Sequence, residues 1–191
     1  MIFDFLQDNY TGLYIHYPFC MHKCPYCDFN SYAKGIDESR DELYFLRLKE
    51  DFSFWKPKLK DRKFISVFIG GGTPSLCKAE LIGNFIDFIA PYLSKDCEIT
   101  MEANPGTVDI NKLKDFKTAG INRLSLGVQS FDDALLKRIG RIHDAAAAKK
   151  ACEDADKCAF SAFNIDLMHG LPGQSLEAAL HDIKIAAALN C

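Results

Sequence analysis

The amino-acid sequence predicts an α/β fold built on a sheet of parallel strands. Short runs rich in β-branched and aromatic residues alternate along the chain with longer stretches of helical periodicity. This alternation favours a parallel sheet with right-handed crossovers, and both a doubly wound sheet and a barrel satisfy it. A full eight-fold barrel needs about 250 residues, more than the 191 present, so the chain can form only part of one.

Five strand–helix units follow one another along the chain. The expected strands are short apolar runs at residues 13–17, 64–69, 98–102, 123–128 and 163–168. The expected helices lie at residues 38–54, 78–93, 109–119, 132–139, 144–157 and 175–191. Gly120 stands where helices commonly end, and Ser175 is a typical N-cap for the last helix.

No further strand follows the helix of the fifth unit to close a barrel. A partial barrel, an open sheet and a truncated product all fit this ending. We expect truncation: residues 1–191 would form the N-terminal part of one domain, without its closing strand and without a C-terminal domain.

Composition and charge exclude several classes of protein. Apolar residues make up 48% and charged residues 26%, which is typical of a folded globular domain. The net charge of −3 is too balanced to indicate a nucleic-acid or membrane surface, and no apolar run approaches the ~20 residues of a membrane span. The first residues lack a basic region ahead of an apolar core, so we expect no secretory signal and a cytoplasmic protein.

Eight cysteines are more than a plain cytosolic domain usually carries. In a reducing compartment, metal ligation or redox chemistry is a commoner use of cysteine than structural disulfides. Cys20, Cys24 and Cys27 crowd into one loop after the first expected strand. We expect the scattered ones to be small buried apolar side chains; these are Cys77, Cys97, Cys152, Cys158 and Cys191.

The cysteine loop alone allows three kinds of chemistry. Three soft sulfur ligands suit an iron–sulfur cluster, and a cubane cluster held by three cysteines keeps one iron open for a small molecule. They also suit zinc, with His16 or His22 as a fourth ligand. A third interpretation uses only Cys24 and Cys27, as a glutaredoxin-like dithiol, and leaves Cys20 unexplained.

Each expected strand ends at a polar or glycine-rich motif. Beyond the cysteine loop, these motifs and the segment after the fourth strand contribute Gly70, Gly71, Gly72, Thr73, Glu102, Gln129, Arg141, Asp166 and His169. Three glycines let the backbone approach a ligand closely, and their amides can hold a carboxylate or an ammonium-bearing group. The carboxyl ends of parallel strands lie on the face where α/β folds bind ligands, so we expect one binding site there.

The cysteine loop resembles that of the radical S-adenosylmethionine (SAM) superfamily, whose C-x3-C-x2-C loop follows the first barrel strand. Residues 14–20, Tyr-Ile-His-Tyr-Pro-Phe-Cys, are similar to the start of the branch that contains oxygen-independent coproporphyrinogen oxidases and the HemW-type haem chaperones. The resemblance covers nearly the whole chain and implies a partial radical SAM barrel. It also implies an electron donor of flavodoxin or ferredoxin type, and cofactor chemistry in which one electron cleaves the sulfonium to release a 5′-deoxyadenosyl radical.

The same resemblance implies a role for each motif. Cys20, Cys24 and Cys27 would hold a 4Fe–4S cluster, and SAM would chelate the open iron through its amino and carboxylate groups. The residues implied around SAM are Tyr14 beside the cofactor, Tyr26 packed among the cysteines, Gly71, Gly72 and Thr73 along the methionine part, Glu102, Gln129 and Arg141 at its polar groups, and Asp166 at the ribose.

The branch is indicated by three features. Phe29 stands where the coproporphyrinogen oxidases carry a further cysteine, and the stretch before the loop is shorter than theirs. The Gly-Arg-Ile-His segment at 140–143 also resembles the haem chaperone side. We therefore expect a haem chaperone with an unknown acceptor protein. Its haem-binding motif would lie beyond residue 191, and a decarboxylase acting on porphyrinogen propionates is the alternative.

Overall fold

The computed structural model describes residues 10–191. The expectation that the first residues form no secretory signal falls largely outside this range. A parallel sheet of five strands forms the centre of the molecule, in the order β1-β4-β5-β6-β7. The strands are β1 (Tyr10–Tyr17), β4 (Lys63–Gly71), β5 (Leu93–Ala103), β6 (Arg123–Gln129) and β7 (Ala162–Leu167). Within this sheet, each strand lies beside the one that follows it in sequence order. This arrangement confirms the expected partial (β/α) barrel.

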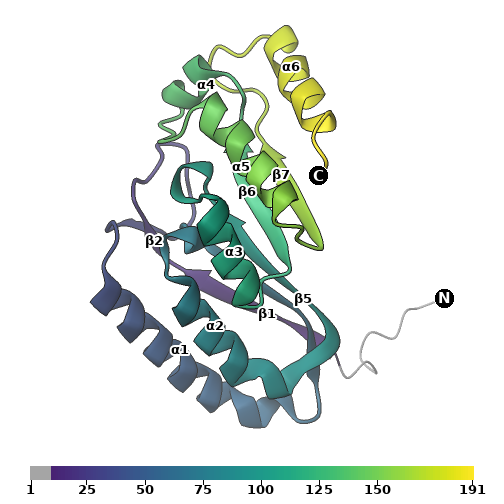
Figure 1. The fold of residues 1–191 in the computed structure, drawn as a ribbon. Coiled ribbons are helices and arrows are strands. Elements are labelled where there is room, and N and C mark those ends of the chain that lie inside the picture. Colours follow the sequence, from purple (N-terminus) through teal and green to yellow (C-terminus); the bar gives the residue numbers. More distant parts are fainter. Residues whose placement is uncertain (1–9) are drawn as a thin grey trace, which may run out of the picture.

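Helices connect these strands and cover one face of the sheet (Figure 1). They are α1 (Glu38–Leu59), α2 (Ala79–Ile89), α3 (Ile110–Thr118), α4 (Asp133–Arg138), α5 (Ala145–Lys157) and α6 (Leu176–Ala187). Side-chain oxygens accept the first free amide hydrogens of most of these helices, as N-capping requires; the capping residues are Asp37, Asp109, Asp132, Asp144 and Ser175. No helix within residues 10–191 is long and apolar enough to cross a bilayer.

The expected boundaries hold within a few residues, with three corrections. The strand expected over residues 98–102 begins five residues earlier, at Leu93. The helix expected over residues 78–93 ends at Ile89, because Pro91 has no amide hydrogen to continue the helical bonding and residues 90–92 form a 3-10 turn instead. The first helix continues beyond residue 54 to Leu59. A short pairing of β2 (Phe19–Cys20) with β3 (Tyr32–Ala33) has no counterpart in the sequence-based expectation.

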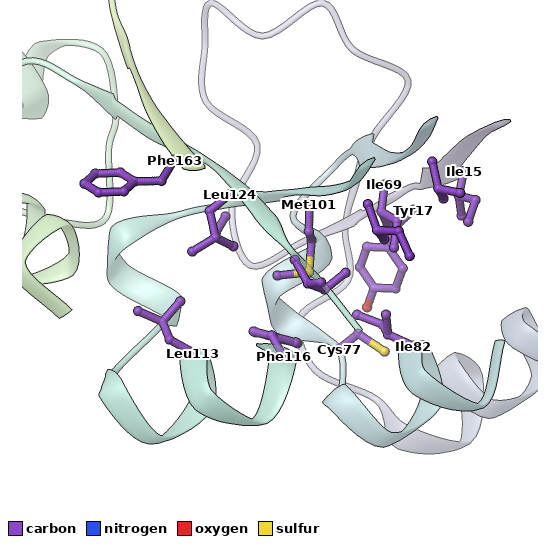
Figure 2. Packing of buried hydrophobic residues seen from close by; sticks show 14 of the residues in the cluster. Ile15, Tyr17, Ile69, Cys77, Ile82, Met101, Leu113, Phe116, Leu124 and Phe163 are labelled. Carbon is purple, nitrogen blue, oxygen red and sulfur yellow. The ribbon is translucent and has the colours of Figure 1, made fainter. Parts of the chain in front are cut away.

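The apolar core fills the space between the sheet and its helices (Figure 2). Met101 and Leu124 point from neighbouring strands toward Phe116 on α3, and all three are fully buried. Cys77, Cys97, Cys152 and Cys158 are buried as expected. Cys191 is exposed, contrary to the expectation, because it follows the end of α6 and no described element covers it.

Candidate functional site

A cavity of about 330 Å³ opens at the carboxyl ends of the strands, a volume in the range of small-molecule sites. Eleven of the twelve residues that the sequence analysis assigned to the site line it: Cys20, Cys24, Tyr26, Cys27, Gly71, Gly72, Thr73, Glu102, Gln129, Arg141 and Asp166. The parallel topology brings their strand ends together across more than 140 residues of sequence. The expected convergence on one face is therefore observed.

The cysteine loop is closed at its base by backbone hydrogen bonds. The Cys20 carbonyl accepts from the amides of Lys34 and Gly35 at 3.1 and 3.0 Å, and the Tyr32 amide donates to Pro18 at 2.8 Å. At the tip, the Cys24 thiol donates to the Gly140 carbonyl at 3.5 Å. The loop is thus held at its base and at its tip, and the residue after Gly140, Arg141, lines the cavity.

Cys20, Cys24 and Cys27 are free thiols on the wall of this cavity. Within residues 10–191, no three His, Cys, Asp or Glu side chains converge closely enough to hold a single metal ion. In a 4Fe–4S cluster each cysteine binds a different iron, so the three sulfurs need not meet at one point. The donor set of three thiols in one closed loop therefore fits a cluster better than a mononuclear zinc ion.

His16, one of the two histidines considered as a zinc ligand, uses both ring nitrogens elsewhere. Its Nδ1 lies 2.9 Å from the Tyr14 hydroxyl, and its Nε2 lies 2.7 Å from the Asn30 carbonyl. Tyr14 is the one expected site residue that does not line the cavity, because it is 57% exposed on β1 and meets only His16 through its hydroxyl. His22 does border the cavity.

The glycine motif after β4 acts through close packing, because its amides are already bonded. Gly71 has φ of 112°, and a Cβ there would lie 2.6 Å from the His16 ring. The amides of Gly72 and Thr73 donate to the carbonyls of Tyr17 and Phe19 at 2.6 and 2.9 Å. These N–H groups therefore tie β4 to the start of the cysteine loop and are not free to hold a carboxylate. An ammonium group would be accepted by carbonyl oxygens of the motif, and that part of the expectation stays a prediction.

Two carboxylates face the cavity from β5 and β7. Glu102 accepts from the Gly71 amide at 3.0 Å, and burial raises its pKa above the ordinary value, with the Asp166 carboxylate adding to the shift. Asp166 accepts from Ser125 Oγ and Asn164 Nδ2, both at 3.0 Å. Each carboxylate is oriented by the protein and retains acceptor capacity for a bound molecule.

Gln129 and Arg141 add hydrogen-bond donors, and Arg141 adds a positive charge, to the cavity wall that carries the two carboxylates. Gln129 adopts φ of 72°, a left-handed conformation that is strained for a residue other than glycine. Arg141 donates to the Gly127 carbonyl and, at 3.4 Å, to the Tyr26 hydroxyl. Its Nε is buried without a hydrogen-bond partner, and Arg141 forms no salt bridge in the described part of the chain. Arg141 lines the cavity, so its positive charge is available to an anionic group bound there.

Sequence reasoning missed several polar residues of the cavity wall. Ser31, Asn104 and Thr107 line it together with the expected set. Asn104 and Thr107 directly follow the third strand, so their place at a strand end was the signal that could have identified them. Ser31 lies at the far end of the cysteine loop, beside the β2–β3 pairing, and its carbonyl accepts from Lys23 Nζ at 3.3 Å; these tertiary contacts are not visible in the sequence.

Residues 14–185 match the family described as the Radical SAM superfamily. The chain belongs to this superfamily. It is 49% identical over 184 residues to the heme chaperone HemW of Haemophilus influenzae and 47% identical over 181 residues to HemW of Escherichia coli, covering 94% of this chain and 48% of each relative. The HemW of Bacillus subtilis is 39% identical over 183 residues, covering 93% of this chain and 47% of that relative.

Among solved structures, the coproporphyrinogen III oxidase HemN of Escherichia coli, a radical SAM enzyme, superposes with a TM-score of 0.84 at 28% identity. The match covers 94% of this chain and 42% of that one. The chain thus spans about half the length of the curated relatives it matches.

Proposed function

We propose that this chain is the cluster-binding part of a HemW-like haem chaperone in the cytoplasm, which transfers haem to an acceptor protein. The observation that carries the proposal is the gathering of three free thiols, two carboxylates, an amide side chain and an arginine around one cavity. The names of relatives that are 39–49% identical support the chaperone branch. The relatives are about twice as long, so haem binding is proposed for the whole protein and not for these residues.

In this proposal Cys20, Cys24 and Cys27 hold a 4Fe–4S cluster that leaves one iron open. The three come from one loop, which supports a single cluster rather than separate sites. When bound, the cluster and SAM together supply one-electron chemistry at the sulfonium, which belongs to the cofactors.

The residues around the cluster are proposed to hold SAM by charge and polarity. Arg141, which lines the cavity and forms no salt bridge within residues 10–191, faces the carboxylate of the methionine part, while Glu102 accepts from the ammonium group. Gln129 can bond either group, because its amide both donates and accepts. Asp166, already held by Ser125 and Asn164, takes the ribose hydroxyls. Gly71, Gly72 and Thr73 leave room along the methionine part, and Tyr26 packs beside the cysteines.

The alternative is an oxygen-independent coproporphyrinogen oxidase of porphyrin biosynthesis, which the superposition on HemN supports. The side chain at position 29 argues against it. Phe29 borders the cavity, is 64% exposed and offers no sulfur ligand at the position where the oxidase branch has a cysteine. An electron donor of flavodoxin or ferredoxin type is proposed for either function.

The two functions are separated by their products. The whole protein, with its cluster reduced under anaerobic conditions, is incubated with SAM and coproporphyrinogen, and the products are separated by chromatography. The chaperone proposal predicts no protoporphyrinogen, and it predicts that the same preparation retains added haem through gel filtration. Multiple turnovers to protoporphyrinogen would reject the chaperone and establish the oxidase.

A further inference from the structure

Asp182 on α6 is a buried carboxylate that the proposed function does not use. Its side chain is 2% exposed, and it does not line the cavity. Its two oxygens accept hydrogen bonds of 2.7 Å, one from Ser130 Oγ and one from the Phe131 amide. It forms no salt bridge within residues 10–191. Burying a carboxylate without a cation costs free energy unless such hydrogen bonds compensate it. The burial of Asp182 therefore calls for a structural or functional reason.

The two donors come directly after Gln129, where the chain leaves β6. Gln129 is held at φ of 72°, and the register of β6 against β7 shifts at this point. Ser130 Oγ also accepts from the Asp132 amide at 3.1 Å, which continues the network toward the start of α4. The Asp182 carboxylate therefore fixes the turn that aims the strained Gln129 into the cavity.

The same turn begins the segment that carries Arg141. Residues 130–141 contain α4, which packs on a small apolar cluster of Leu135, Ile139 and Leu171 separate from the main core. Arg138 on α4 donates to the Pro172 carbonyl at 3.0 Å, so the segment also rests on the loop before α6. At its end, Gly140 lies against the cysteine loop, where an added Cβ would be 2.7 Å from Pro25 Cδ. The segment is thus anchored on two sides: α6 and its loop hold it through Asp182, Leu171 and Pro172, while Phe131 packs in the main core and Arg141 donates to the Gly127 carbonyl of β6.

We propose that Asp182 is a positioning residue for SAM, acting through Gln129 and Arg141 without touching the ligand. The inference rests on the proposed function and adds α6 to the elements that determine SAM affinity. Gln129 and Arg141 are proposed to reach the amino-acid part of SAM. Loss of Asp182 should therefore weaken recognition of that part and leave recognition of the adenosine part intact.

The test measures binding to the anaerobically reconstituted chain by equilibrium dialysis, with SAM and with 5′-deoxyadenosine, which lacks the amino-acid part. Asp182→Ala should raise the Kd for SAM about tenfold, since two buried donors lose their acceptor. Ser130→Ala removes one of the two bonds to Asp182 together with the bond that Ser130 Oγ accepts from the Asp132 amide, and it should raise the Kd about threefold. The Kd for 5′-deoxyadenosine should stay within about twofold in both variants. Hydrogen exchange should speed up over residues 129–141 in Asp182→Ala and not over residues 63–103.

Asp154 provides the matched control, because it is also 2% exposed but lies on α5, bonded to Lys150 and away from the cavity. Asp154→Asn should lower the melting temperature while leaving both Kd values unchanged. Equal weakening of SAM and 5′-deoxyadenosine, or an unchanged SAM Kd in Asp182→Ala and Ser130→Ala, would overturn the positioning role alone. A wild-type chain that carries its cluster but binds no SAM would overturn the proposed function and this inference with it.

Discussion

At the scale of single residues, the eight cysteines divide by environment. Cys20, Cys24 and Cys27 border the cavity, whereas Cys77 and Cys152 are each 1% exposed and lie away from it. Burial raises the pKa of both Cys77 and Cys152 to about 12, so these thiols stay protonated and are poor metal ligands at neutral pH.

We predict that anaerobic reconstitution yields about four iron and four sulfide per chain. Replacing Cys20, Cys24 or Cys27 by Ala should abolish the brown cluster, because three thiolates are the minimum that leaves a single open iron. Cys77→Ala and Cys152→Ala should keep it. Iron, sulfide and the visible absorption band are the measurements. One zinc per chain without iron uptake would contradict the cluster assignment.

Asp166 gives a second prediction at this scale. Asp166→Ala removes a carboxylate that Ser125 and Asn164 already orient, so a ribose hydroxyl enclosed against it would lose its acceptor. We expect SAM binding to weaken by ~1–3 kcal/mol, measured by equilibrium dialysis. Asp96→Ala, on an exposed carboxylate outside the cavity, serves as the control. Equal affinity of the Asp166 variant and the wild type would remove Asp166 from the proposed site.

The raised pKa of Glu102 predicts a pH dependence. Burial raises this pKa from 4.5, the Gly71 amide and His16 oppose the shift, and the Asp166 carboxylate reinforces it. Glu102 therefore takes up a proton at a higher pH than an ordinary glutamate. The protonated form cannot pair with the ammonium group of SAM, so affinity should fall as the pH is lowered through this raised pKa, beginning above pH 4.5.

The measurement is the SAM Kd across a pH series in wild type and Glu102→Gln. The glutamine variant should bind more weakly at neutral pH and lose the dependence in this range. The same pH profile in both proteins would show that another group controls binding.

At the scale of elements, Gly140 connects the end of α4 to the cysteine loop. It has φ of 72°, and a Cβ there would lie 2.7 Å from Pro25 Cδ in that loop. Gly170 has nearly the same φ, 70°, but a Cβ there would meet nothing within 4 Å. Alanine substitutions at Gly140 and Gly170 therefore distinguish the effect of backbone strain, which both share, from the effect of contact with the cysteine loop, which only Gly140 has.

We predict that Gly140→Ala and Gly170→Ala each lower the free energy of unfolding by about 1–2 kcal/mol, the cost of a left-handed conformation with a Cβ. Gly140→Ala should additionally displace the loop and speed the loss of iron to a chelator, followed by the decay of visible absorption. Gly170→Ala should release iron at the wild-type rate. Equal rates in the two variants would mean that Pro25 accommodates the added methyl group.

At the scale of the whole molecule, the sheet has two edges within the described residues, β1 and β7. Beside β7, α6 exposes an apolar row of Leu176, Leu180 and Ile183 at 71%, 45% and 57%. An unpaired strand edge next to exposed apolar side chains promotes pairing between chains.

We predict that the 191-residue chain self-associates in solution, as measured by light scattering after gel filtration. Ile183→Lys should reduce the associated fraction, and a longer chain that supplies a further strand and domain should reduce it more. Arg47→Lys on the distant α1, an exposed conservative change, is the control. A monodisperse, cooperatively melting monomer would contradict the prediction.

The sequence by itself determined the features that depend on neighbours in the chain. The alternation of strands and helices, the three-cysteine loop and the polar strand ends are local patterns, and the parallel topology then requires the strand ends to meet. Even the helix end at Ile89 was within reach, because the proline that causes it is visible in the sequence.

Only the tertiary structure decided which polar groups remain available at the site. The amides of Gly72 and Thr73 are occupied by carbonyls more than 50 residues away, and Tyr14 meets His16 outside the cavity wall. Asp182 reaches Ser130 across 52 positions, and the buried Nε of Arg141 has no partner. Such hydrogen bonds follow from how packed helices and strands place distant side chains, and no local periodicity encodes that placement.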